Sequence, residues 1–101
     1  MEAPSVIVSF RGRGTEDLFD GNDTKAARKV LPSELHERGG KVLDQLQAAV
    51  SLKSLSLPGL RLEKLKGDRA GQYSIRINDQ FRVCFEWGEA GPEEVEIVDY
   101  H

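Results

Sequence analysis

The chain has little cysteine and little histidine: Cys84, His36 and His101 are the whole supply among 101 residues. A single cysteine cannot form a disulfide within the chain, which is typical of the reducing cytosol. Cys84 stands among alternating apolar residues in FRVCFEW, which predicts a packed strand position. Because the two histidines are far apart in the sequence, the residues predict no metal site and no metal cofactor.

Long apolar runs are also missing. The apolar stretches have the length of strands, so the sequence predicts no membrane span. Residues 1–9 lack the basic start and the following apolar run of a secretion signal. We therefore expect a cytoplasmic protein. With 39% hydrophobic and 31% charged residues, the composition predicts one globular domain over residues 1–101.

Basic residues are absent after Arg82, although six acidic residues follow it. The net charge is −3, which argues against a protein that binds nucleic acid over its whole surface. Between Ser51 and Arg82, however, seven Lys and Arg residues face only three Asp and Glu residues. This segregation favours a local anion site in the middle segment. Ordinary solvated strand faces would give the same pattern, so that alternative stays open.

The N-terminal half predicts one strand followed by helices. Residues 5–10 form a β-rich run, and Thr15 with two following acids predicts the N-cap of a short helix. A second short helix is expected over residues 25–30. The clearest helix begins with Ser33 as its N-cap and contains the pair Gly39–Gly40, where a kink or break can form. Its apolar stripe consists of Leu35, Val42, Leu43, Leu46, Ala49 and Val50.

In the C-terminal half the apolar period changes from that of a helix to two. The expected strands are residues 60–66, 72–77, 80–87 and 95–98. Asn78–Asp79 predicts a tight hairpin turn, and residues 88–93 predict a longer one. The sequence therefore predicts an α+β fold, with an N-terminal strand and helices packed on a twisted, mainly antiparallel sheet.

Five residues form the candidate catalytic set. Lys66 ends one predicted strand, Arg82 projects from the middle of another, and Asp99, Tyr100 and His101 are adjacent at the end of the last. Metal-independent RNA cleavage needs groups that move protons to and from the 2′- and 5′-oxygens, and fixed positive charge on the phosphorane. Histidine titrates near neutral pH, and Arg and Lys bind phosphate. A solvated arginine and an ordinary polar terminus are the alternatives.

The sequence resembles the HigB branch of the RelE superfamily, the toxins of type II toxin–antitoxin modules, which are also called plasmid-maintenance killer proteins. The resemblance rests on LPGLRLEKLKGDRAGQYSIRINDQFRVCFEW, on the closing DYH, and on the opening SFRGRGTEDLFDG, so it covers nearly the whole chain. It implies a microbial RNase-like fold and a ribosome-dependent mRNA interferase that cuts mRNA in the ribosomal A site.

The resemblance also implies roles for the candidate residues. Lys66 matches a phosphate-contacting lysine and Arg82 the arginine that stabilises the transition state. His101 is the favoured acid or base, Asp99 its support or the alternative base, and Tyr100 a stacking partner for a base. We expect further RNA contacts from Lys64, Arg69, Arg76 and Gln80. Strand parity separates Tyr100 from Asp99 and His101, so a shared pocket would need a twist or bulge.

The partners implied by the resemblance are a HigA-type helix-turn-helix antitoxin, the ribosome and mRNA, with operator DNA reached only through the antitoxin. One alternative of a different class remains: a catalytically silent protein of the same fold that serves as a binding partner for the antitoxin and its DNA complex. A third, a free single-strand RNA binder, is disfavoured because such a protein would expose several aromatic side chains.

Overall fold

The computed structural model describes residues 6–100. Three α-helices come first: α1 (Arg13–Phe19), α2 (Lys25–Val30) and α3 (His36–Ala48). Four strands follow: β1 (Glu63–Lys64), β2 (Tyr73–Arg76), β3 (Phe81–Gly88) and β4 (Gly91–Asp99). Short 3-10 turns lie at Ser33–Leu35, Leu52–Leu55 and Gly67–Arg69. The α+β fold predicted from the sequence is confirmed.

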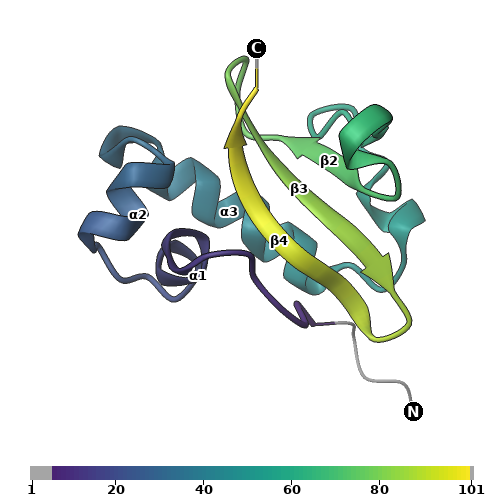
Figure 1. Cartoon of the computed structure of the whole chain (residues 1–101), viewed down its shortest axis with the longest axis horizontal. Helices are drawn as coiled ribbons and strands as arrows, with labels where there is room; N and C mark the ends of the chain where they lie inside the picture. Colours follow the sequence, from purple (N-terminus) through teal and green to yellow (C-terminus); the bar gives the residue numbers. More distant parts are fainter. Residues whose placement is uncertain (1–5, 101) are drawn as a thin grey trace.

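The strands form one sheet in the order β1-β2-β3-β4, with every neighbour antiparallel. Figure 1 shows α1, α2 and α3 on one side of the sheet, and the segment between α3 and β2 beyond the β2 edge. Residues directly opposite each other on paired strands share a face. Ile75, Val83 and Ile97 are opposite one another and belong to the core with residues of α3. This arrangement leaves the other face for the functional side chains.

The core explains why the chain adopts this architecture. Strands β2 and β3 are buried on both faces over much of their length, and α3 buries Val42, Leu43 and Leu46 of the predicted stripe. Val50, which was expected to join the stripe, follows the helix and is exposed. The largest fully buried side chains are Phe85, Leu31, Leu43, Leu46, Leu55, Ile75, Ile77, Val83 and Val95. No helix within residues 6–100 is long and apolar enough to cross a membrane.

Two predicted N-caps are wrong. The N-cap of α1 is Gly12, three residues before the expected Thr15, and Thr15 is a buried residue inside the helix. Its hydroxyl oxygen accepts a hydrogen bond from the Ile97 backbone N–H at 3.1 Å. The side chain therefore binds the backbone of β4 and does not cap a helix. Ser33 makes no capping bond, because residues 33–35 form a 3-10 turn ahead of α3. Helix α3 then runs unbroken through Gly39–Gly40.

The strand boundaries also differ from those expected. The predicted strand over residues 60–66 is reduced to β1, and the predicted long turn over residues 88–93 is a two-residue connection at Glu89–Ala90. The described part of the predicted first strand makes one parallel bridge, Phe10 to Val95, and no regular strand. Hydrogen bonds from Val8 and Arg11 nevertheless hold this segment beside β4. The hairpin at Asn78–Asp79 is confirmed, since both Gln80 and Phe81 donate backbone N–H groups to the Asn78 side chain.

Candidate active site

Arg82 is the second residue of β3, not a mid-strand residue as expected, and is buried, with 7% of its surface exposed. Its Nη1 donates to the hydroxyl of Ser74 on β2 and lies 3.4 Å from an oxygen of Glu63 on β1. Its Nη2 donates to the backbone carbonyl of Arg61 at 3.3 Å. The alternative of a solvated arginine is therefore wrong: the guanidinium is fixed by three different segments.

Arg61 reaches this position in an unusual backbone conformation. Its φ of 45° lies in the left-handed region, which is rare for a residue with a side chain. Such conformations cost on the order of 1–3 kcal/mol and cluster at functional sites. Here the strained residue supplies the carbonyl that receives Arg82.

Tyr100 covers the same guanidinium. The Cζ atom of Arg82 lies 5.4 Å from the centroid of the Tyr100 ring, which is the geometry of a cation–π contact. The backbone N–H of Tyr100 donates to the carbonyl of Gln80, the residue before β3, at 2.6 Å. This bond fixes the backbone of Tyr100 beside the start of β3. With 42% of its surface exposed, Tyr100 presents an aromatic face to solvent directly above a buried cation.

A hollow of about 240 Å³ opens beside Tyr100 and is lined also by Leu65, Lys66, Asp68 and Arg69. Lys66 is exposed. Arg69 is half-buried and is held by two bonds from its Nη1, to Gln72 at 2.9 Å and to Glu96 at 3.2 Å. The structure thus brings together Lys66, Arg69, Arg82 and Tyr100, which the sequence analysis proposed as site residues.

The remaining proposed residues lie elsewhere or are not described. Asp99 accepts a hydrogen bond from Gln80 at 3.1 Å, and by register it shares the face of Phe81, opposite to Arg82. Strand parity therefore separates Asp99 from Tyr100 as expected. The irregularity in the β3–β4 pairing lies near Cys84 and Glu86, so it does not correct this separation. His101 lies outside the described residues.

Three of the four predicted RNA contacts, Lys64, Arg76 and Gln80, do not line the hollow. By register Lys64 shares the face of Tyr73, opposite to Arg82. Arg76 is the cross-strand partner of Arg82, but its guanidinium binds the Asp79 carboxylate and lines a different hollow next to α3. The hydrogen bond from Arg76, together with its charge, lowers the pKa of Asp79.

Sequence reasoning missed the residues that hold the site. Three of them lie on the same face of the sheet as Arg82: Ser74, Glu63 and Glu96. Glu63 is the cross-strand partner of Ser74, and Cys84 is the cross-strand partner of both Ser74 and Glu96. The alternation of residues within one strand shows which residues of that strand share a face with Ser74 or with Arg82. Only the register between the strands shows that Ser74 and Arg82 lie on the same face and can contact each other. Glu96 contacts Arg69 across 27 positions in the chain, for which the sequence carries no local signal.

Cys84 lies on this face but is buried with 1% of its surface exposed, which confirms its predicted place in a packed strand. Burial raises the pKa of its thiol, so the protonated form is favoured. Within residues 6–100, no group of three or more His, Cys, Asp or Glu side chains is placed to hold a metal ion.

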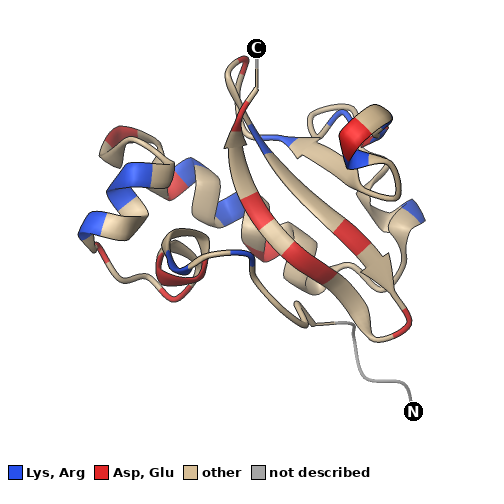
Figure 2. Cartoon of the chain, in the orientation of Figure 1, with Lys and Arg blue, Asp and Glu red and all other residues tan. Residues whose placement is uncertain are grey.

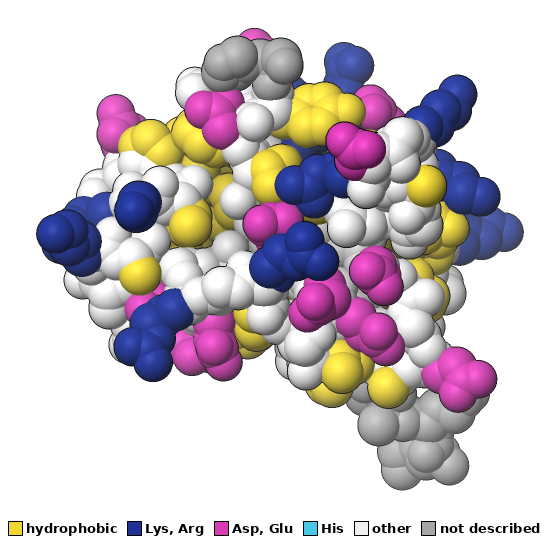
Figure 3. All heavy atoms as spheres, in the orientation of Figure 1, with side chains coloured by type: hydrophobic (Ala, Val, Ile, Leu, Met, Phe, Trp, Pro, Cys, Tyr) yellow, Lys and Arg dark blue, Asp and Glu magenta, His cyan; other side chains and the backbone are white. Residues whose placement is uncertain are grey.

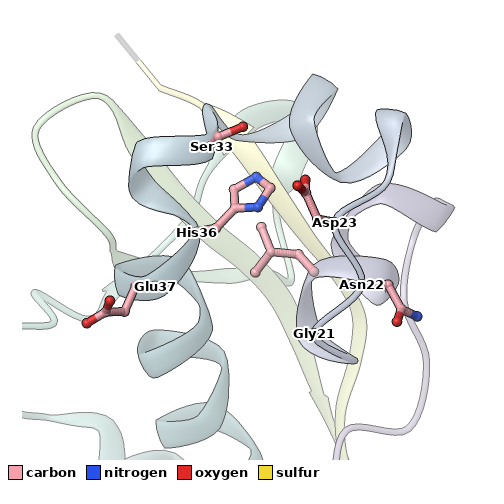
Figure 4. A pocket seen from close by; sticks show the side chains of 7 residues that line it. Gly21, Asn22, Asp23, Ser33, His36 and Glu37 are labelled. Carbon is pink, nitrogen blue, oxygen red and sulfur yellow. The ribbon is translucent and has the colours of Figure 1, made fainter.

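A larger hollow, of about 340 Å³, lies between the turn after α1 and the start of α3 (Figure 4). Asn22, Asp23, Ser33, His36 and Glu37 line it. The Nε2 atom of His36 donates to the Leu31 carbonyl at 2.7 Å, so this histidine ties the start of α3 to the end of α2. None of the proposed site residues lines this hollow.

Comparison with known proteins shows the family of this chain. Residues 8–101 match the family described as the RelE-like toxin of type II toxin–antitoxin system HigB. The chain belongs to the HigB-like toxin family. It is 33% identical over 83 residues to Toxin HigB-1 of Vibrio cholerae serotype O1, covering 81% of this chain and 84% of that protein. It is 27% identical over 96 residues to the Endoribonuclease HigB of Proteus vulgaris, covering 95% and 100%.

The fold of this HigB-like toxin also matches a solved structure. The YoeB–YefM complex from Staphylococcus aureus contains a chain with a TM-score of 0.58 and 15% sequence identity, covering 94% of this chain and 97% of that one. At that identity the likeness shows the fold alone. The predicted HigB-type membership is confirmed, and the predicted endoribonuclease activity agrees with the name of the Proteus relative.

Proposed function

We propose that this HigB-like toxin is a ribosome-dependent, metal-independent mRNA interferase that cleaves mRNA in the ribosomal A site and so inhibits translation. The observation that carries the proposal is the fixed guanidinium of Arg82 beneath the exposed ring of Tyr100, beside a hollow lined by Lys66 and Arg69. Such a site offers positive charge for a phosphate and an aromatic face for a base.

The guanidinium is prepared for the charge that develops in the reaction. Its contacts with Ser74, Glu63 and Arg61 use Nη1 and one hydrogen of Nη2. Donors that are fixed before the reaction need no reorganisation as the phosphorane forms, which is the main source of electrostatic catalysis.

The proposed step is an internal transfer at phosphorus. The 2′-oxygen gives its proton to a base and forms a bond to phosphorus, while the bond to the 5′-oxygen breaks and that oxygen receives a proton. A cyclic 2′,3′-phosphate and a free 5′-hydroxyl result. We assign the proton transfers to His101 and the stabilisation of the phosphorane to Arg82 with Lys66. Asp99, which by register lies on the face opposite to Arg82 and accepts a hydrogen bond from Gln80, is assigned no part in the step.

Dependence on the ribosome follows from how little the site offers to free RNA. Tyr100 is the one large aromatic side chain that is exposed within residues 6–100. Proteins that hold single strands unaided stack several bases on aromatic platforms. Acidic residues also lie along β4, as Figure 2 shows, and would repel a free polyanion on that side. A ribosome that presents the mRNA would remove the need for a large RNA-binding surface.

The proposed partners are an antitoxin of the HigA type, with a helix-turn-helix, and through it operator DNA. We place the protein in the cytoplasm, where ribosomes and mRNA are available. The competing function is that of a catalytically silent binding partner. It would give the hollow beside Tyr100, with its cationic side chains, no substrate to bind.

Induced expression in a growing cell tests the proposal. Wild type should arrest growth, and primer extension on a reporter mRNA should show new cuts confined to the translated region. Lys66→Ala should lose most of the cuts, because Lys66 lines the hollow. Lys53→Ala, which removes another exposed lysine outside the hollow, should behave like wild type. Intact mRNA and normal growth with wild type would favour the silent binding partner.

A further inference from the structure

A second hollow, of about 350 Å³, lies between α3 and the edge of the sheet at the end of β2. Three cationic side chains line it: Arg38 and Lys41 from α3 and Arg76 from β2. Its remaining lining is mostly apolar and consists of Val42, Gln45, Leu57, Gly59, Leu60 and Ile77. We call this the α3–β2 groove. It contains none of the residues that line the hollow beside Tyr100.

Arg38, Lys41 and Arg76 line the same hollow. The hydrogen bond and charge of Arg76 lower the pKa of Asp79, and the charges of Arg61 and Arg38 act in the same direction. Two carboxylates oppose the cations. Asp79 binds Arg76, and Glu37 lies 3.7 Å from Lys41 in a pair whose side chains are 87% and 75% exposed. Such an exposed pair is weak, so it does not neutralise the groove.

The groove is also apolar where a soluble surface would ordinarily be polar. Leu57 is 48% exposed at its edge, and a Cβ on Gly59 would meet no atom within 4 Å. Exposed apolar area beside a group of cationic side chains is typical of a surface that binds a protein segment of the opposite charge. A phosphate backbone would use the cations but not the apolar floor.

The surrounding charges favour this side of the molecule for an acidic partner. Figure 3 shows acidic side chains gathered over β4, where a partner with negative charge would be repelled. The basic side chains of the groove lie on α3 and β2. Because the whole chain carries a net charge of −3, attraction of an acidic partner has to be local.

We propose that the α3–β2 groove is a docking surface for the antitoxin and takes an acidic, amphipathic segment, with its carboxylates on Arg38, Lys41 and Arg76 and an apolar side chain against Leu57 and Leu60. This inference rests on the proposed antitoxin partner and not on the proposed nuclease activity. It places antitoxin binding next to the active site without occupying it, since Arg76 is the cross-strand neighbour of Arg82.

Titration calorimetry of the full-length toxin with the antitoxin encoded beside it tests the docking surface. The double variant Arg38→Gln/Lys41→Gln should bind at least about tenfold more weakly, a loss of about 1.4 kcal/mol. Lys25→Gln/Lys29→Gln removes the same charge from exposed positions on α2, outside the groove, and should bind like wild type. Equal loss in both double variants would show a general charge effect and overturn the proposal.

A second pair of variants separates the apolar floor from the charges. Leu57→Ser should weaken antitoxin binding several-fold, whereas Val50→Ser, at an apolar residue that is 69% exposed and outside the groove, should not. Unchanged affinity in both groove variants overturns the proposal. If their antitoxin affinity is unchanged but they no longer sediment with ribosomes, the groove binds RNA instead. The calorimetry measures the affinity of the toxin for the antitoxin and does not depend on mRNA cleavage. If the wild-type toxin cuts no mRNA, the proposed nuclease function is wrong, but the docking surface can still be tested in this way.

Discussion

The guanidinium of Arg82 and the ring of Tyr100 face each other, with 5.4 Å between the guanidinium carbon and the ring centroid. One of the two residues is 7% exposed and the other 42% exposed, so the tyrosine forms the outer wall of a site whose inner wall is the arginine. Any substrate group that stacks on Tyr100 is held within reach of a cation that is already oriented by Ser74 and Arg61. We therefore expect the site to favour a ligand with both a planar ring and a negative charge.

Arg82→Lys should abolish most of the cleavage. A lysine keeps the charge but cannot contact Ser74, Glu63 and the Arg61 carbonyl while also offering a planar pair of donors to phosphate. We expect a fall in the cleavage rate of about 10²-fold or more, the loss seen when a fixed transition-state donor is removed. Arg28→Lys, at an exposed ion pair on α2, is the matched control. If Arg82→Lys still cleaves mRNA at the wild-type rate, the planar pair of guanidinium donors is not needed for cleavage.

Tyr100→Phe and Tyr100→Ala should differ. Phenylalanine keeps a ring over Arg82 and a surface for stacking, so cleavage should stay within a few-fold of wild type. Alanine removes the ring and should raise the KM for translated mRNA about tenfold or more, because stacking on one aromatic side chain contributes about 1–3 kcal/mol per base. Steady-state kinetics on a reporter mRNA measures both. If Tyr100→Phe is as inactive as Tyr100→Ala, the hydroxyl and not the ring is the functional group.

Thr15→Val should destabilise the fold without touching the site. Valine has nearly the shape of threonine but cannot accept the hydrogen bond from the Ile97 N–H, which would remain buried and unpaired. The free energy of unfolding should fall by about 1–3 kcal/mol. Thr15→Ser keeps the hydroxyl and should retain more of the stability, and urea denaturation compares the two. Equal stability of Thr15→Val and wild type would contradict the assigned role.

The Cys84 thiol should react slowly in the folded protein. Burial raises its pKa, and the reactive species is the thiolate, so a thiol reagent at pH 8 should label the protein at a rate limited by unfolding. The raised pKa also makes stability depend on pH. Its contribution is complete below the pKa of the unfolded thiol, about 8.5, and is lost as the pH rises toward the folded value. Rapid labelling at neutral pH in the absence of denaturant would contradict this burial.

Much of the sheet could be predicted from the sequence, because alternation and the turn residues Asn78–Asp79 are local signals. The helix starts could not. Thr15 and Ser33 have the right residue types for N-caps, but tertiary contacts assign Thr15 to β4 and a 3-10 turn removes Ser33. The burial of Arg82 also escaped prediction, since alternation gives the face of a residue but not what covers that face.

The catalytic roles of the candidate residues stay predictions, and only their positions can be compared with the structure. The resemblance to HigB toxins pointed to Lys66, Arg82 and Tyr100, and the structure places them around one hollow and its buried neighbour. The supports Glu63 and Glu96 required knowledge of the register between strands, which no single segment encodes.

The most direct test of the central claim compares one mRNA in two states. Purified toxin is added to a cell-free translation reaction with a reporter mRNA, and to the same reaction with a reporter whose start codon has been removed. The account predicts cuts within the coding region of the translated reporter only, and their loss with Arg82→Lys. Equal cutting of both reporters would contradict dependence on the ribosome, and no cutting of either by wild type would contradict the assignment of a nuclease to this site.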